Sequence, residues 1–438
     1  MKILFINPAT KKDRVARDGK IKGSDIFRYP KLGLLSVAAL TDKSIDIEFC
    51  DETIEKINYN TDADLIAISS VTALAPRSYK LAKKFRDLGK TIVMGGMHAT
   101  FLPDECLKHV DSVVIGQAEG SWERLLKDYQ KGNLKKNYSS NISTELKIPF
   151  ARRDPEQKKG YAKGHVFGIS RGCSYRCEFC SVTHFFKGKY YKRPIEDVVQ
   201  ELKTLPHKII NITDDNLFCD PSYSKELFKA LIPLKKHLLF QASVNITNDI
   251  ELMQLIKRAG GKGVFIGIES LDSSNIRDVS KFQNNVKKYH EVIKTFHDHG
   301  MVVEAGMMFG FDNDTNRVFK NVYDFAMDSK LDLMQVGIVT PMPGTKLHDR
   351  MIKEGRIIDG NWANYDCKHV VFKTKNITKK QLEDGTNWLR SKFYSYPSII
   401  TRGVANFSSL GIIGILGYFL RGNLGFRKNY KSGLDYPP

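Results

Sequence analysis

Three cysteines lie close together in residues 171–181, which read RGCSYRCEFCS. The CxxxCxxC spacing of Cys173, Cys177 and Cys180 gathers three thiolates on one short loop, and iron–sulfur clusters use such sulfur-rich ligand sets. A structural zinc site has four ligands, and no fourth cysteine or nearby histidine completes this set. A four-iron cluster held by three cysteines leaves one iron open to a reactant. The loop therefore predicts a catalytic cluster, with a zinc site as the alternative.

The motif resembles that of the radical S-adenosylmethionine (SAM) superfamily. Phe179, directly before the last cysteine, matches an aromatic position common in that motif. The resemblance implies that the open iron of a 4Fe-4S cluster binds SAM, and that the enzyme cleaves SAM reductively to a 5′-deoxyadenosyl radical. The cofactors carry this chemistry and the protein positions them. The motif does not identify the substrate.

Strand and helix patterns alternate from residue 166 onward. The cysteine loop follows the first of six predicted strands. The strand patterns cover residues 166–170, 208–213, 238–243, 263–268, 302–309 and 333–339. Six β/α units are too few for a full eight-stranded barrel. They predict an open, TIM-like partial (β/α)6 barrel, which is also the fold that the resemblance implies.

Polar and small residues lie at the carboxyl ends of these strands, where barrel enzymes gather their catalytic groups. Asp214 and Asp215 end the second strand, and Glu269 ends the fourth. The resemblance implies that the two aspartates hold the amino group of SAM and that Glu269 binds its ribose hydroxyls. A helix cap is the alternative for Asp215. The other cofactor contacts expected at strand ends are Ser243, Asn245 and Gly310.

A separate alternation of strands and helices precedes this core. Strand patterns at residues 2–7, 45–51, 64–71, 91–95 and 112–115 alternate with helical patterns at residues 32–40, 78–88, 103–108 and 121–129. This order predicts a five-stranded, doubly wound α/β domain of the Rossmann-like or flavodoxin-like kind. Ligands of such domains bind outside the carboxyl ends of the strands.

Small and polar residues follow the strands of this first domain, and its position upstream of the cysteine loop makes it similar to the cobalamin-binding domains that precede radical SAM cores. The expected cobalamin contacts are Ser70, Val71, Gly95, Gly96, His98, Gly116 and Glu119. The chain departs from the family pattern, because residues 8–14 read PATKKDR where a DxHxxG motif would stand. A histidine ligand from that motif is therefore not expected, and His98 is expected to make an ordinary hydrogen bond. A domain that serves only as a scaffold is the alternative.

The composition sets the domain organisation. With 438 residues and 42% apolar content, the chain is long enough for two or three cores. We expect a cobalamin-binding domain at residues 1–135, a linker at 136–164, the radical SAM core at 165–345 and a helical C-terminal region at 346–438. The seven cysteines form no disulfide framework, and the N-terminus carries no secretory pattern, so a cytoplasmic location is expected.

The net charge of +19 suits attraction to nucleic acid or to an anionic membrane, although the lysines are spread along the whole chain. Residues 404–420 are apolar and precede Arg421, Arg427, Lys428 and Lys431. This segment is short and glycine-rich for a spanning helix, so it favours peripheral membrane contact or a buried terminal helix. No RNA-binding module closes the chain, and nucleic acid is therefore not expected as a partner.

Taken together, the residues and the resemblance predict a cobalamin-dependent radical SAM methyltransferase that acts on an unactivated carbon of a lipid or other small molecule. A flavodoxin or ferredoxin-type electron donor is implied. The alternatives are radical cyclisation, rearrangement or carbon–carbon coupling without methyl transfer, and an RNA-modifying radical SAM enzyme, since a shared layout does not fix the reaction.

Overall fold

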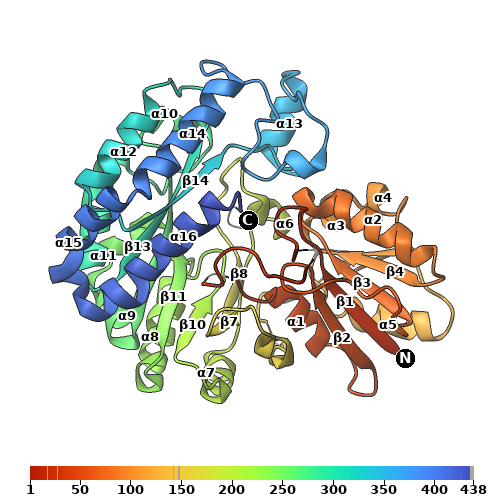
Figure 1. Ribbon diagram of the computed structural model, residues 1–438. Helices are drawn as coiled ribbons and strands as arrows, with labels where there is room; N and C mark the ends of the chain where they lie inside the picture. Colours follow the sequence, from red (N-terminus) through yellow and green to blue (C-terminus); the bar gives the residue numbers. More distant parts are fainter. Residues whose placement is uncertain (17, 27, 142, 147, 435–438) are drawn as a thin grey trace.

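The computed structural model describes residues 1–16, 18–26, 28–141, 143–146 and 148–434. Two six-stranded sheets lie side by side, and each is covered by its own helices (Figure 1). All strand pairs within these two sheets are parallel. The predicted combination of a Rossmann-like domain and a partial barrel is confirmed.

The first sheet has the order β2-β1-β3-β4-β5-β6. Its strands are β1 (Lys2–Asn7), β2 (Asp46–Asp51), β3 (Leu65–Ser69), β4 (Thr91–Gly95), β5 (Ser112–Ile115) and β6 (Asn137–Ser139). Its helices are α1 (Leu32–Ala39), α2 (Ala75–Arg86), α3 (Met97–Phe101), α4 (Pro103–Cys106) and α5 (Trp122–Gln130). Five strands were expected. The sixth, β6, has only three residues, too few to show a strand pattern.

Helices cover both faces of this sheet, which explains why its central strands are almost entirely apolar. Leu81 and Phe85 of α2 belong to the core on one face, and Leu34 of α1 and Trp122 of α5 belong to the core on the other. Ligands of doubly wound sheets bind outside the carboxyl ends of the strands, where the loops after β3, β4 and β5 begin.

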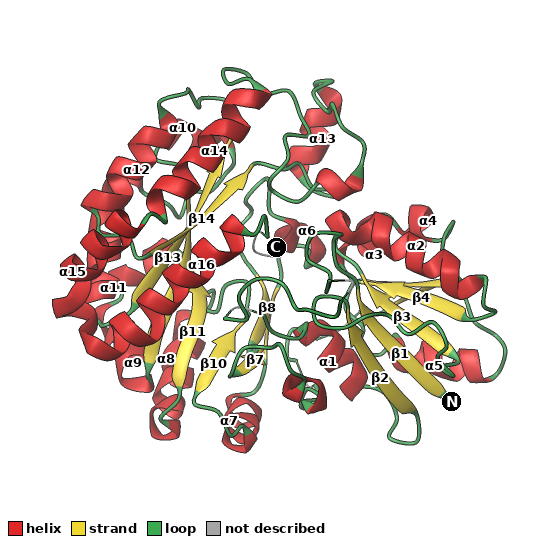
Figure 2. Cartoon of the chain, viewed as in Figure 1, coloured by secondary structure: helices red, strands yellow, loops and turns green. Residues whose placement is uncertain are grey.

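The second sheet has the order β14-β13-β12-β11-β10-β7 and forms an open barrel. Its strands are β7 (His165–Phe167), β10 (Ile209–Ile212), β11 (His237–Ala242), β12 (Gly261–Glu269), β13 (Val302–Phe309) and β14 (Leu333–Ile338). The outer helices are α7 (Ile195–Thr204), α8 (Pro221–Leu231), α9 (Ile250–Ala259), α10 (Ser273–Asp278), α11 (Tyr289–Asp298) and α12 (Val318–Asp328) (Figure 2).

Successive side chains along each strand of the barrel alternate between two environments. In β11, Leu238, Phe240 and Ala242 are buried in the core shared with the helices, whereas Leu239 and Gln241 lie on the inner face. This alternation follows from the two-residue period of a strand. The inner face is thus available to line a cavity.

A small antiparallel sheet frames the cysteine loop. It pairs β8 (Ser170–Gly172) with β9 (Tyr190–Lys192), and the short helix α6 (Ser181–Phe185) lies between the two strands in sequence. The C-terminal region adds α13 (Lys346–Lys353), α14 (Lys379–Phe393), α15 (Tyr396–Ile413), a π-helix (Gly414–Leu420) and α16 (Arg421–Lys431). Within the described residues, the helical stretch Tyr396–Lys431 is long and apolar enough to cross a membrane by length and composition alone, although it is interrupted at Gly411, whose φ is +62°.

Candidate active site

The cysteine loop lies between β8 and α6, at the carboxyl end of the first barrel strand. Asn216 Nδ2 lies 3.6 Å from Cys173 Sγ, and Gln283 Nε2 lies 3.6 Å from Cys177 Sγ. Amide donors beside sulfur stabilise the negative charge of metal-bound thiolates. Burial raises the pKa of the Cys177 and Cys180 thiols, so their ionised form depends on a bound cation. The donor set fits an iron–sulfur cluster.

A fourth cysteine lies beside this loop. Cys219 Sγ is 4.0 Å from Cys173 Sγ, although the two residues are 46 positions apart in the sequence. The expectation that no fourth cysteine lies near the three was therefore wrong. Cys219 follows β10, and the barrel brings the loop after β10 next to the loop after β7. The spacing of the motif gives no signal of this contact.

The two aspartates after β10 are bonded to the backbone that enters the cysteine loop. Asp214 is 2% exposed and accepts hydrogen bonds from the backbone N–H groups of Ile169 and Ser170. Asp215 accepts one from the Gly172 N–H at 2.9 Å. Burial raises the pKa of Asp214 to about 7 and also raises that of Asp215. Both carboxylates thus fix β8, and their contact with SAM stays a prediction.

A cavity of about 420 Å³ lies between the two domains. Four of the residues expected to contact cobalamin line it from the first domain: Gly95, Gly96, Gly116 and Glu119. The opposite wall includes Ser170, Arg171, Asp214 and Asp215, next to the cysteine loop. The loops predicted for two different cofactors therefore meet at one cavity.

Two glycines that line this cavity, Gly96 and Gly116, are there for different reasons. Gly96 has a φ of +96°, and a Cβ added there would lie 2.7 Å from the carbonyl oxygen of Ser70. Gly116 also has a positive φ, +76°, but a Cβ there would meet nothing within 4 Å. The close approach of the Ser70 backbone and the positive φ therefore require a glycine at position 96. At position 116 the absence of a side chain leaves open space beside the cavity.

Glu119 and Arg171 join the two domains across the cavity. Arg171 Nη1 donates to Glu119 Oε1 at 2.7 Å and to Gln117 Oε1 at 3.0 Å. The second carboxylate oxygen, Glu119 Oε2, is buried and has no hydrogen-bond partner within the described part of the chain. This oxygen is available to accept a hydrogen bond from a ligand, such as one of the amide groups at the edge of a corrin ring.

The other three residues expected at this site do not line the cavity. His98, the second residue of α3, is fully buried with its Nε2 2.7 Å from Tyr79 Oη of α2, and burial lowers its pKa. Ser70 is also buried, and its hydroxyl bonds to Ser78 of α2 at 3.0 Å. Val71 leads into the turn that precedes α2. Ser70, Val71 and His98 thus lie away from this cavity, and their contact with cobalamin stays a prediction. His98 makes the ordinary hydrogen bond that was expected of it.

Glu269 ends β12 in a strained conformation beside a second cavity. Its φ is +65°, and the pairing of β12 with β13 shifts register between Gly267 and Glu269. The carboxylate forms a buried ion pair with Lys281 and lines a cavity of about 250 Å³ on the inner face of the barrel. A strained backbone of this kind is stored at functional sites and needs support from its surroundings. The expected ribose contact of Glu269 stays a prediction.

Ser243 and Asn245 support the cysteine loop and the residues beside it. Ser243 Oγ accepts a hydrogen bond from Asn216 Nδ2 at 3.0 Å, which orients the amide toward Cys173. Asn245 Nδ2 donates to the hydroxyl of Tyr175, within the cysteine loop, at 2.9 Å. Both side chains therefore act on the loop through other residues, and their expected contact with SAM stays a prediction.

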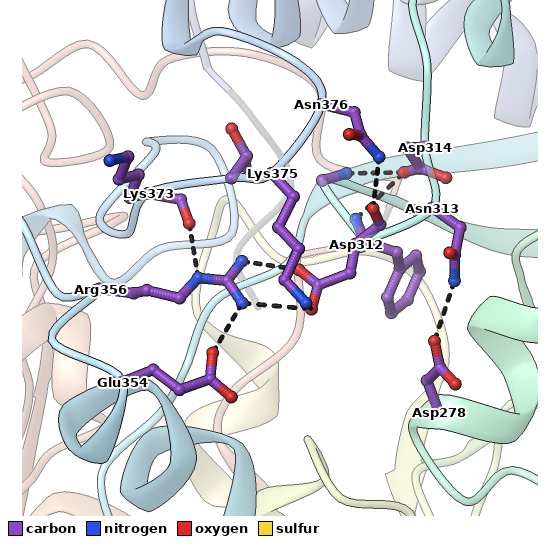
Figure 3. A network of polar contacts seen from close by, with 12 residues as sticks. Asp278, Asp312, Asn313, Asp314, Glu354, Arg356, Lys373, Lys375 and Asn376 are labelled. Carbon is purple, nitrogen blue, oxygen red and sulfur yellow. Dashed lines mark hydrogen bonds and ion pairs between the residues drawn. The ribbon is translucent and has the colours of Figure 1, made fainter.

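The loop after β13 is fixed by a polar network. Asp314 accepts hydrogen bonds from the N–H groups of Gly310 and Phe311 at 2.9 and 3.1 Å. Gly310 has a φ of +99°, which favours glycine. Figure 3 shows the neighbouring contacts, in which Arg356 bonds to both carboxylate oxygens of Asp312 at 2.6 and 3.1 Å. The C-terminal region thus fixes the end of β13, where the cofactor contact of Gly310 is expected.

Phe179 packs into an apolar cluster at the same end of the barrel. Its ring contacts the cluster formed by Val279, Phe311, Leu347 and their neighbours, and the Lys281 ammonium lies 5.9 Å from the ring centroid. The aromatic position of the motif thus stands between the cysteine loop and the ion pair of Glu269. Lys281, Gln283 and Arg171 carry no sequence signal of their own, since their partners are distant along the chain.

Comparisons with known proteins identify both domains of this chain. The radical SAM superfamily model matches residues 168–326, and the B12 binding domain model matches residues 25–126. The bacteriochlorophyllide d C-12(1)-methyltransferase of Chlorobaculum tepidum is 29% identical over 85% of this chain and 84% of that protein. The C-8(2)-methyltransferase of the same organism is 30% identical over 78% of this chain and 80% of that protein.

The fold is also that of a solved enzyme. The radical SAM methyltransferase TsrM from Kitasatospora setae, determined with cobalamin and a [4Fe-4S] cluster bound, superposes with a TM-score of 0.66 at 13% identity over 99% of both chains. The order of the two domains and the residues at their shared cavity lead to one assignment. The chain belongs to the radical SAM superfamily, in the group whose core follows a B12-binding domain.

Proposed function

We propose that the enzyme transfers a methyl group to an unactivated carbon of a lipid or other apolar small molecule. The observation that carries this proposal is the single cavity shared by the glycine loops of the first domain and the entry to the cysteine loop. When bound, the cluster and SAM supply the 5′-deoxyadenosyl radical and cobalamin supplies the methyl group. Both relatives described above are named as methyltransferases, which supports the same reaction.

In this proposal the chain's own residues orient the cofactors. Cys173, Cys177 and Cys180 hold the cluster, and Asp214 and Asp215 keep the β8 backbone in position through their hydrogen bonds. Arg171 and Glu119 lock the cysteine loop to the cobalamin side of the cavity. A fixed separation between the reacting groups lowers the entropic barrier of a reaction between bound partners.

The inner face of the barrel suits an apolar substrate. On the inner face of the barrel, the cavity beside Glu269 is lined by the side chains of Phe265 and Met308. Methionine side chains adapt their shape to irregular apolar ligands. We therefore place the apolar part of the substrate against these residues, with its reacting carbon toward the carboxyl ends of the strands.

We also propose a cytoplasmic location and a small one-electron donor of the flavodoxin or ferredoxin type. All seven cysteines are free thiols, which suits a reducing compartment. Cys173 and Cys180 are only half-buried, so an electron donor can approach the loop that carries them.

Anaerobic turnover with SAM that carries a deuterated methyl group tests the reaction. Reconstituted enzyme is incubated with reductant, hydroxocobalamin and a lipid or tetrapyrrole extract, and the products are analysed by mass spectrometry. The proposal expects a labelled methyl group in one product class, and neither label nor deoxyadenosine with Cys177→Ala. Deoxyadenosine formed by the wild type without any labelled product would instead support cyclisation, rearrangement or coupling.

A further inference from the structure

Exposed apolar side chains are concentrated on the C-terminal helices. Ile400, Val404, Phe407, Ile412, Ile413 and Leu416, which we call the apolar stripe, are each between 55% and 73% exposed. The first three are spaced four and three residues apart and share one face of α15. The other three follow Gly411, whose non-helical φ of +62° interrupts α15. Soluble monomers rarely leave so many large apolar side chains of one segment in water, so the stripe indicates an interaction surface.

The opposite face of α15 is fixed to the barrel. Arg402 is 1% exposed and donates to the carbonyl oxygens of Leu331 at 3.0 Å and Phe393 at 2.8 Å. Asn406, also buried, donates to Asp332 Oδ1 at 2.7 Å. A helix whose one face carries these polar contacts to the protein is not surrounded by lipid, so it does not span a bilayer here. It is placed to lie along a membrane surface, on the outer side of the barrel next to α11 (Figure 1).

The charged residues near the apolar stripe in the sequence are all basic, which favours binding to an anionic surface. No aspartate or glutamate occurs in residues 385–434, and the chain as a whole carries a net charge of +19. On α16, Arg421 and Lys428 stand three residues before and four residues after exposed Leu424, and therefore share its face. Neither has an ion-pair partner among the described residues. Basic side chains flanking an apolar face are typical of helices that bind anionic lipid.

The same helices wall the cavities of the barrel. Tyr418 and Arg421 line a cavity of about 230 Å³ on the inner face, and Phe426 and Tyr430 line the cavity that contains Glu269. The stripe itself lies on the outer side of the barrel, and the π-helix and α16 connect α15 to these cavity walls along the chain.

We propose that the apolar stripe and the basic face of α16 dock onto a bilayer that contains anionic phospholipid, with α15 lying parallel to the membrane plane. This docking does not depend on the reaction proposed above, because it concerns the outer surface of the C-terminal helices. It places the enzyme at the membrane periphery, from the cytoplasmic side.

Co-sedimentation with vesicles tests the docking. The full-length protein is mixed with vesicles of phosphatidylcholine and phosphatidylglycerol in equal parts, or with phosphatidylcholine alone. Two variants are compared: Val404→Glu/Ile413→Glu in the stripe, and the control Ile250→Glu on α9, where the side chain is 70% exposed. Thermal melts of each variant show whether it is folded.

We expect the wild type and Ile250→Glu to sediment with the anionic vesicles, and the stripe variant to bind at least ten-fold more weakly while melting like the wild type. Arg421→Glu/Lys428→Glu should lose the preference for phosphatidylglycerol, and salt should weaken binding of the wild type. Equal binding of the wild type and the stripe variant would overturn the proposal. A wild-type dimer that the stripe variant dissociates, without binding to vesicles, would overturn it in favour of a second copy as the occupant.

Discussion

The Arg171 guanidinium lies 2.7 Å from the Glu119 carboxylate, across the boundary between the two domains. Arg171 stands two residues before Cys173, and Glu119 stands in the loop after β5. One ion pair therefore joins the segment that carries the cluster ligands to the segment that faces the proposed cobalamin site. Both partners are largely removed from water, where a charge-assisted hydrogen bond contributes more than it does on the surface.

Replacing Glu119 by Gln should weaken cobalamin binding while leaving cluster loading intact. The substitution removes the charge that holds Arg171 and weakens the acceptor facing the cavity, so retention of hydroxocobalamin should fall roughly ten-fold or more. Equilibrium dialysis followed by absorption spectroscopy measures the change. Glu48→Gln, on the far edge strand β2, is the control and should bind as the wild type does. If Glu119→Gln retains as much hydroxocobalamin as the wild type, Glu119 does not contribute to cobalamin binding.

The Cys173–Cys219 contact predicts a specific oxidation of the cluster-free protein. Two thiols with their sulfur atoms 4.0 Å apart need only a small movement to form a disulfide when a small-molecule disulfide accepts their electrons. Treatment with oxidised glutathione should lower the number of free thiols per chain by two. Peptide mapping should find Cys173 joined to Cys219. Cys219→Ser should not form this link and should take up iron and sulfide after the same treatment. Mapping to another cysteine pair would contradict the placement.

Gly96→Ala should destabilise the first domain. A Cβ at this position meets the backbone of Ser70 at 2.7 Å and requires an unfavourable positive φ, so the free energy of unfolding should fall by about 2 kcal/mol or more. Denaturant unfolding measures the loss. Gly360→Ala is the control, because a Cβ there meets nothing within 4 Å and its φ is not positive. A variant as stable as the control would show that the loop after β4 is mobile enough to move aside.

Glu304 should make stability depend on pH. It lies on the inner face of the barrel, accepts a hydrogen bond from Gln335 Nε2 at 2.7 Å, and has a pKa raised by burial from 4.5 to about 7. The folded state thus binds this proton more tightly than the unfolded state. Its contribution is most favourable below pH 4.5 and is lost as the pH rises to about 7.

Glu304→Gln should remove this dependence. Between pH 5 and pH 8, the wild type should lose about 2 kcal/mol of unfolding free energy relative to the variant. Urea unfolding at the two pH values gives the difference, with Glu226→Gln on the exposed face of α8 as the control. The same pH dependence in both proteins would show that Glu304 is already ionised at pH 5.

The sheets could be predicted from the sequence because parallel strands buried on both faces leave continuous apolar runs. The predicted strands at residues 2–7, 91–95, 112–115 and 302–309 have the observed bounds. The hairpin of β8 and β9 could not be predicted in this way, since its strands have three residues each and include charged side chains.

The site was predictable only in part, for a different reason. The cysteine motif is local, so its spacing reveals it. Cys219 and Gln283 reach the loop from 46 and 106 residues away, and no local pattern records such contacts. Ser70 and His98 turn away from the cavity because they bond to Ser78 and Tyr79 of α2, contacts that no local pattern records.

We propose above all that one chain holds a cluster and cobalamin around a shared cavity. The most direct test is the absorption spectrum of protein purified without oxygen, reconstituted with iron and sulfide, given hydroxocobalamin and then desalted. The account predicts a retained corrin spectrum together with the broad absorption of the cluster. A cluster spectrum without corrin would contradict it, and would leave the first domain as a scaffold for a radical enzyme that does not use cobalamin.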